Sequence, residues 1–290
     1  MTFIPAGSAD SEIGFESCSD CVLPVPAALA VSKDGSFWIA DPLKQRIAHF
    51  SSDGTFLAAI PVDRGPEDVA FVGDRLYVLP EVGGAVILGV KNGRLSKEIV
   101  ANDEGKRLHV QGLIGGQDKL VTLIAGAESL LGGYWAMATV DPATGQVVPS
   151  AGAQVSGSRF MDFAPLVDTP DADYEIRWSD GHETLEQQVV RFQLMKNGRD
   201  LRTSVGDTYL RATSSTGFVT LVNLGGRQGL PAGRWFMEVP ADGTQSTFER
   251  VPQEGFIGHS LRYLAVGDDG TIYWMRLLDD GLHVYQRNGE

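Results

Sequence analysis

The sequence contains two cysteines, five histidines and no long hydrophobic run. Because no stretch approaches the roughly 18 apolar residues that a membrane helix needs, we expect no transmembrane span. Lysine and arginine total 24 against 37 aspartates and glutamates, which gives a formal net charge of −13. Such a chain repels phosphate backbones and anionic lipids, so nucleic-acid binding is disfavoured. The opening residues, MTFIPAG, lack the basic region and apolar core of a secretory signal.

Sequence motifs for common catalytic and cofactor sites are absent as well. There is no Gly-x-Ser-x-Gly elbow, no recognisable serine–histidine–aspartate context, no dinucleotide fingerprint and no phosphate loop. The histidines are scattered, without the HxH or HExxH spacing of metal sites. We therefore expect no cofactor. A divalent metal held by His109, His259 and Glu67 is the less favoured alternative.

The two cysteines, Cys18 and Cys21, have CxxC spacing in a loop followed by prolines. A zinc ribbon would need a second such pair, and a thioredoxin-like motif would need a helix N-terminus at the first cysteine. We expect a local disulfide, with reduced thiols as the alternative. A disulfide indicates an oxidising compartment, so the protein is predicted to be periplasmic or secreted, its leader not being present in this chain.

Glycine is abundant, with 35 copies, and many of these glycines mark tight turns between short runs of strand-forming residues. Two Asp-Gly pairs, Asp34-Gly35 and Asp53-Gly54, divide residues 26–62 into four such runs. Asp-Gly between apolar runs is a strong hairpin signal, so these residues predict a four-stranded antiparallel meander. The predicted strands are 27–32, 36–40, 46–51 and 55–62.

The meander recurs along the chain at an offset of about 40 residues, the spacing of propeller blades. Residues 66–100 repeat it clearly, and residues 108–149, 159–205, 208–251 and 260–290 repeat it more weakly. In the fourth unit, Asp180-Gly181 and Asn197-Gly198 are the expected hairpins, and residues 182–190 are the best candidate for one or two helical turns. The last unit lacks a strand, which residues near Thr2 to Ala6 are expected to supply.

These repeats predict an all-β fold in a single domain, residues 1–290. The expected architecture is a six-bladed β-propeller of four-stranded antiparallel blades, closed by the N-terminal strand pairing with the last blade. Residues 26–62 resemble an NHL repeat, and gluconolactonase-like propellers share that architecture. The resemblance implies a fold rather than a function. It is carried by Asp34, Gly35, Trp38, Ile39, Ala40, Asp41, Arg46, Ile47 and Phe50.

Two positions of the chain bear on these resemblances, Asp41 and Glu67. Asp41 matches the NHL aspartate, and we expect its carboxylate to cap a turn and pair with Arg46. Gluconolactonase-like enzymes bind calcium through a glutamate in a Glu-Gly-Pro context. This chain has Gly65-Pro66-Glu67 instead, so that role is not carried over.

In such a blade, the connection leading into the first strand and the loop between the second and third strands lie on one face of the ring. We call it the loop face and predict that it carries the binding site. The loop between the second and third strands of the third unit is rich in apolar side chains, which suggests a contact surface there. The predicted ligand- or partner-binding residues are Arg64, Arg107, Leu130, Leu131, Tyr134, Trp135 and Arg227.

The favoured function is that of a non-catalytic, extracytoplasmic propeller that binds a protein partner or small ligand on this face. The alternative is an enzyme of lactonase, hydrolase or lyase type at the mouth of the central channel. His109 and His259 would then act as acid, base or metal ligands, Glu67 as base or ligand, and Arg159 as carboxylate anchor. A structural subunit of a larger assembly is a third reading.

Overall fold

The computed structural model describes residues 1–15, 25–81, 83–115, 120–125, 135–149, 155–156, 160–163, 174–184, 187–196, 199–205, 208–214, 217–224, 233–240, 247–251, 264–267, 269, 271–278 and 280–287. Regular structure in these ranges is β-strand, in antiparallel sheets, which confirms the all-β prediction. Since these ranges hold no helix, they hold none that is long and apolar enough to cross a membrane.

The first sheet has the strands that the Asp-Gly pairs predict. Its order is β2 (Ala28–Val31), β3 (Phe37–Asp41), β4 (Arg46–Phe50) and β5 (Phe56–Pro61). At the first turn, Gly35 has φ +78° and the Asp34 carboxylate accepts the Ser36 N–H at 3.1 Å. The second turn repeats this pattern with Gly54 at φ +89° and Thr55 donating to Asp53 at 3.1 Å. Both hairpins are therefore confirmed, with aspartate and glycine in their expected roles.

Three further sheets have four strands each. The second consists of β6 (Asp68–Val72), β7 (Arg75–Leu79), β8 (Val86–Lys91) and β9 (Arg94–Val100). The third consists of β12 (His109–Gly115), β13 (Leu120–Ala125), β14 (Trp135–Val140) and β15 (Val147–Pro149). The fifth consists of β21 (Thr208–Ser214), β22 (Gly217–Leu224), β23 (Gly233–Pro240) and β24 (Thr247–Val251). A short ribbon, β10 (Asn102–Asp103) with β11 (Lys106–Arg107), joins the second sheet to the third.

The fourth sheet differs from the prediction. It has five strands in place of four: β16 (Val155–Ser156), β17 (Phe160–Phe163), β18 (Tyr174–Thr184), β19 (Gln187–Lys196) and β20 (Arg199–Val205). Asp180-Gly181 is not a hairpin turn, because both residues lie within β18 opposite Val190 and Val189. The helical turns expected at 182–190 are also wrong, since β18 and β19 cover most of that segment. A long cross-strand ladder has overridden local turn and helix preferences.

The last sheet brings the two ends of the chain together. Its order is β1 (Thr2–Pro5), β27 (Gly281–Arg287), β26 (Ile272–Leu278) and β25 (Leu264–Val266). β1 runs antiparallel to β27, with Thr2 opposite Val284 and Ile4 opposite Leu282. The Thr2 hydroxyl also donates to the Ser52 carbonyl in the β4–β5 turn at 2.7 Å. The N-terminal strand thus contacts both the last sheet and the first.

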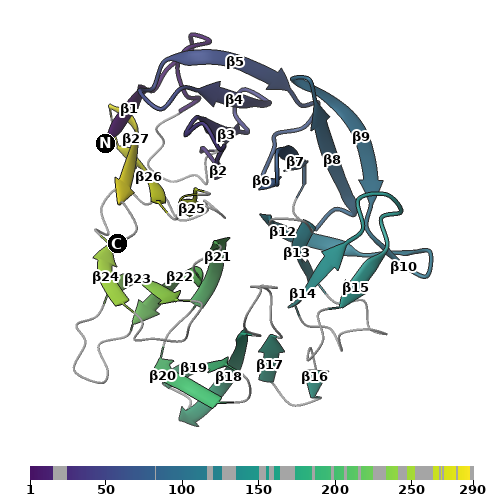
Figure 1. Ribbon diagram of the computed structural model, residues 1–290, viewed down its shortest axis with the longest axis vertical. Helices are drawn as coiled ribbons and strands as arrows, with labels where there is room; N and C mark the ends of the chain where they lie inside the picture. The colour runs from purple at the N-terminus through teal and green to yellow at the C-terminus, as the bar shows by residue number, and fades with distance from the viewer. Residues whose placement is uncertain are drawn as a thin grey trace.

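The first strands of the first, second, third, fifth and last sheets lie nearest a common centre, whereas β16 of the fourth sheet lies farther out (Figure 1). β2 contacts β6 and β25, β6 contacts β12, and β21 contacts both β12 and β25. The apolar core lies between neighbouring sheets. One cluster joins the last sheet to the first, through residues such as Ile4, Phe37 and Leu264. Others join the first sheet to the second and the second to the third.

Candidate functional site

Asp41 and Arg46 form a buried ion pair on the loop face. Asp41 ends β3 and Arg46 begins β4, so the short β3–β4 loop brings the two side chains together. Arg46 Nε donates to Asp41 Oδ2 at 3.0 Å, and both side chains are almost entirely buried. The pairing expected from the NHL-like pattern is confirmed.

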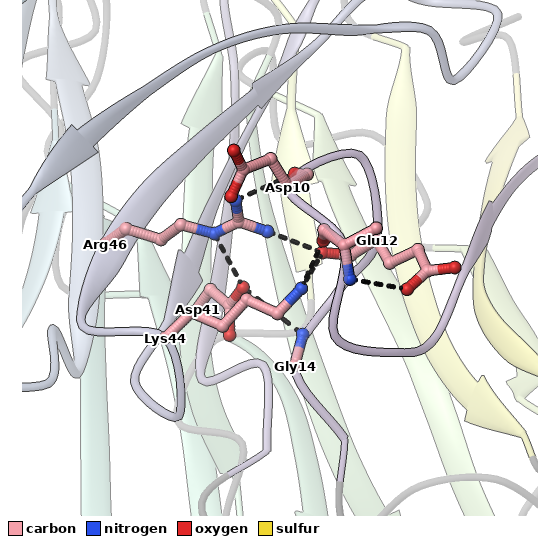
Figure 2. A network of polar contacts seen from close by, with 7 residues as sticks. Asp10, Glu12, Gly14, Asp41, Lys44 and Arg46 are labelled. Carbon is pink, nitrogen blue, oxygen red and sulfur yellow. Dashed lines mark hydrogen bonds and ion pairs between the residues drawn. The ribbon is translucent and has the colours of Figure 1, made fainter.

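The same loop holds the segment that follows β1 (Figure 2). Arg46 donates to the Asp10 carbonyl at 2.8 Å and to the Glu12 carbonyl at 2.5 Å. Lys44 Nζ donates to the carbonyls of Ala9 at 2.5 Å and Glu12 at 2.8 Å. We call Asp41, Lys44 and Arg46 the clasp. Its cations are engaged with backbone oxygens, so its role is to fasten residues 9–14 to the first sheet.

Gly14 packs closely against Asp41 of the clasp, and Lys44 of the clasp is partly removed from water. The Gly14 N–H donates to Asp41 Oδ2 at 3.3 Å. A Cβ at Gly14 would lie 2.6 Å from Asp41 Oδ1, which leaves room for glycine only. Burial, followed by the nearby Arg46 charge, lowers the pKa of Lys44.

A second charged pair lies on the loop face at the second sheet, and it is exposed. Arg64 lies in the connection leading into β6, and Glu81 follows β7. Arg64 Nη1 and Glu81 Oε2 are 2.5 Å apart, with the side chains 72% and 56% exposed. The neighbouring Gly65 packs against Pro42, where a Cβ would lie 2.9 Å from the proline ring. The leading connection of the second sheet therefore rests on the β3–β4 loop of the first, as expected for one shared face.

His109 is the exposed first residue of β12, and its ring is oriented by the β7–β8 loop. Its Nδ1 is hydrogen-bonded to the Gly83 carbonyl. Because a carbonyl oxygen can only accept, Nδ1 carries the proton, and Nε2 of the neutral ring presents a lone pair. Backbone bonds of 2.8 Å from Gly83 to Val110 and from Val110 to Gly84 hold this arrangement. The residue that His109 contacts, Gly83, is thus only two positions after Glu81 in the β7–β8 loop.

Glu67 and Asp68 have different surroundings, as expected for adjacent residues on a strand. Asp68 is buried and joins two sheets, because its carboxylate accepts the N–H of Val69 at 2.7 Å and of Leu113 at 2.6 Å. Glu67 is half-buried, and its own N–H donates to the Leu79 carbonyl at 2.9 Å. Glu67 is therefore the member of the pair that is partly accessible on the loop face.

The structure brings some predicted site residues together and separates one. Arg64 contacts Glu81 and His109 contacts Gly83, both in the β7–β8 loop, whereas the Glu67 N–H bonds to Leu79 at the end of β7. Glu81 is not among the predicted binding residues, although its loop is expected on the loop face. A carboxylate in the loop after the second strand, on the same face as Arg64, was the available signal. Arg107 is exposed on β11, in the ribbon whose partner β10 packs beside β15.

The other predicted residues fall where nothing of their side chains is described. Trp135 begins β14, but its side chain is outside the described part. Outside the described residues altogether are Cys18, Cys21, Leu130, Leu131, Tyr134, Arg159, Arg227 and His259. In the part of the chain that is described, no three histidine, cysteine, aspartate or glutamate residues are grouped as metal ligands.

Antiparallel sheets arranged around one centre define the class of this protein: it is a β-propeller. The sequence matches no family model and no curated protein. Its structure is similar to a gluconolactonase from Xanthomonas campestris, at 12% identity and a TM-score of 0.52, covering 90% of this chain and 85% of that one. It is also similar to the PQQ-bound aldose sugar dehydrogenase from Streptomyces coelicolor, at 12% identity and a TM-score of 0.55, covering 91% and 94%. The fold is that of propellers of the NHL and gluconolactonase type, as the resemblance implies.

Proposed function

We propose that the chain is a single-domain, six-bladed propeller, closed by β1, that binds a protein partner or small ligand on its loop face outside the cytoplasm and without catalysis. Pairing of β1 with β27 and the contacts among the innermost strands support the closed ring. The observation that carries the binding function is the gathering of Arg64, Glu81 and His109 at one place on that face.

These side chains offer the groups that recognition needs. The Arg64 guanidinium engages Glu81 through one nitrogen, so its fork retains donors for a ligand carboxylate. His109 adds an exposed acceptor at Nε2 when the ring is neutral. The connections that carry these groups are held by backbone bonds and by Gly65 packed on Pro42. A preorganised surface of this kind loses little entropy on binding.

The test is a binding screen by calorimetry with sugar acids and acidic peptides as probes. Any probe bound by the protein should bind at least about tenfold more weakly to Arg64→Ala, a loss of about 1.4 kcal/mol. The matched control is Lys33→Ala, since Lys33 forms an exposed ion pair with Asp74 at 2.8 Å between turns at the opposite ends of the strands. Equal losses in both variants would contradict a site on the loop face.

The orientation of His109 also favours the enzymatic alternative. The lone pair that Nε2 of the neutral His109 ring presents on the loop face suits general acid–base catalysis. Under this alternative, the protein would open a sugar lactone, and His109→Ala would abolish turnover while Lys33→Ala would retain it. A pH-stat assay with a panel of lactones, with and without added divalent metal, decides the matter. Absence of turnover in all conditions would remove the alternative.

A further inference from the structure

The β8–β9 turn consists of Asn92 and Gly93, and both residues are exposed. Their φ angles are +53° and +69°, and Lys91 pairs with Arg94 across the turn. Positive φ at both central residues is the pattern of a type I′ hairpin, for which Asn-Gly is a preferred dipeptide. A Cβ at Gly93 would meet nothing within 4 Å. Water therefore reaches both residues of this turn.

The backbone N–H of Gly93 differs from those of the glycines in the two turns of the first sheet. Gly35 N–H donates to the Ser32 carbonyl at 2.9 Å, and Gly54 N–H donates to the Ser51 carbonyl at 3.0 Å. Gly93 N–H has no acceptor among the described residues. Its nitrogen is therefore not held away from the side chain of the preceding residue.

The side-chain amide of Asn92 is also without a hydrogen bond to the described residues, whereas that of Asn102 is held at both ends. Asn102 Nδ2 donates to the Val100 carbonyl at 3.0 Å, and Asn102 Oδ1 accepts the Gly105 N–H at 3.3 Å. Asn102 is followed by Asp103 in place of a glycine. The chain thus contains one unrestrained asparagine before a glycine and one restrained asparagine that serves as a comparison.

Two positive charges flank the turn. Lys91 and Arg94 are exposed and lie directly opposite each other, so their charges repel. Neither forms an ion pair with the described residues. Positive charges near Gly93 stabilise the anion that forms when its N–H loses a proton, and they also attract a carboxylate at position 92. Both the reacting anion and a negatively charged product are therefore favoured here.

We propose that Asn92 is a site of spontaneous deamidation, assisted by the charges of Lys91 and Arg94. The Gly93 nitrogen attacks the side-chain carbonyl carbon of Asn92. The new C–N bond closes a succinimide ring, and the amide nitrogen leaves as ammonia with the proton from Gly93. Water then opens the ring at either carbonyl, which gives aspartate or isoaspartate at position 92. Asparagine is a thermolabile residue because it can lose its amide in this way.

Ring closure requires rotation about the Cα–C bond of Asn92, out of the turn conformation. An exposed turn at the end of two strands opens locally at low free energy, so the rotation is accessible in the folded chain. The β7–β8 loop lies on the loop face, so the β8–β9 turn lies at the other end of these strands. The modification site is therefore separate from the proposed binding site and goes beyond the proposed function.

The test is incubation of the full chain in mildly alkaline heavy-oxygen water, followed by peptide mapping with mass spectrometry. Asn92 should take up heavy oxygen at a rate within about tenfold of that of the free peptide VKNGRLS, which is residues 90–96. Asn102 should react at least about tenfold more slowly than Asn92, because its amide is restrained. An isoaspartyl methyltransferase with labelled S-adenosylmethionine should label the peptide that contains position 92.

Two outcomes of this experiment would overturn the proposal. A rate at Asn92 more than about tenfold below that of the free peptide would show that the folded turn protects the residue. Equal rates at Asn92 and Asn102 would show that the free amide and the following glycine have no effect.

A double variant tests the part played by charge. Lys91→Gln with Arg94→Gln retains Asn92 and Gly93 but removes both cations, and it should slow deamidation about two- to fivefold. Lys33→Ala, which removes a cation from a different turn, should leave the rate unchanged. Circular dichroism verifies that each variant is folded. An unchanged rate in the double variant would overturn the assistance by Lys91 and Arg94.

Discussion

Asp41 has its carboxylate fully buried, with Arg46 as its charged partner and the Gly14 N–H as a further donor to the same oxygen. Its other oxygen, Oδ1, has no hydrogen-bond partner among the described residues. Removing one member of a buried pair leaves the other charge uncompensated in a poorly solvated place. The residues of the clasp therefore contribute to stability as a unit.

At this scale, we expect Asp41→Ala to lower the free energy of unfolding by about 3–5 kcal/mol. Lys33→Ala, which removes an exposed ion pair, should cost about 0–1 kcal/mol. Urea denaturation followed by circular dichroism measures both values. Similar losses in the two variants would show that the clasp is not a stabilising element.

At the scale of elements, a series of hydrogen-bonded side chains links the β2–β3 turn to β4. Ser32 donates to Asp34 at 2.5 Å and lies 2.5 Å from the Ser36 hydroxyl, which is 2.8 Å from His49 Nε2. The His49 ring stacks on Trp38 with centroids 3.9 Å apart. Hydrogen bonds from Ser32 and Ser36 lower the pKa of Asp34 to about 2. Asp34 therefore stays ionised, and its negative charge raises the pKa of His49 and partly offsets the lowering by burial.

Burial lowers the pKa of His49 below its ordinary value of 6.5. As the pH decreases below about 6.5, His49 is protonated in the unfolded chain before it is protonated in the folded chain. The free energy of unfolding therefore decreases with decreasing pH. We expect the urea midpoint to decrease between pH 7.5 and 5.5, and His49→Phe to flatten that dependence. Tryptophan fluorescence, to which Trp38 beside the ring contributes, follows unfolding. Parallel profiles for the wild type and the variant would contradict this role.

At the scale of the molecule, the N-terminal strand is the point where the first and last sheets meet. Ile4 is fully buried in the cluster that spans both, whereas Phe3, on the opposite side of the same strand, is exposed. If β1 closes the ring, its buried side chain should stabilise the whole structure rather than one strand.

We therefore expect Ile4→Ala to cost about 2–5 kcal/mol in a single cooperative transition, through lost burial and a cavity. Phe3→Ala should cost less, because part of its ring already contacts water. Guanidinium denaturation with hydrogen exchange at β27 measures both. Local loosening of β27 with unchanged global stability would count against closure by β1.

Sequence reasoning succeeded where strands are joined by short turns with their own chemistry. Asp34-Gly35 and Asp53-Gly54 place a carboxylate on the following backbone and a glycine at positive φ, and both hairpins form as expected. It failed at Asp180-Gly181, because the same dipeptide lies within a long ladder in β18. Asp-Gly forms a turn only where its two residues are not paired within a longer strand ladder.

The sequence by itself determined the all-β class, the repeated meander and the Asp41–Arg46 pair, because each depends on residues a few positions apart. Only the tertiary structure decided that Arg46 and Lys44 fasten residues 9–14, that Gly83 orients His109, and that Arg64 meets Glu81. Those contacts join segments about 17 to 36 residues apart. Their partners are chosen by the packing of whole sheets, which no local pattern specifies.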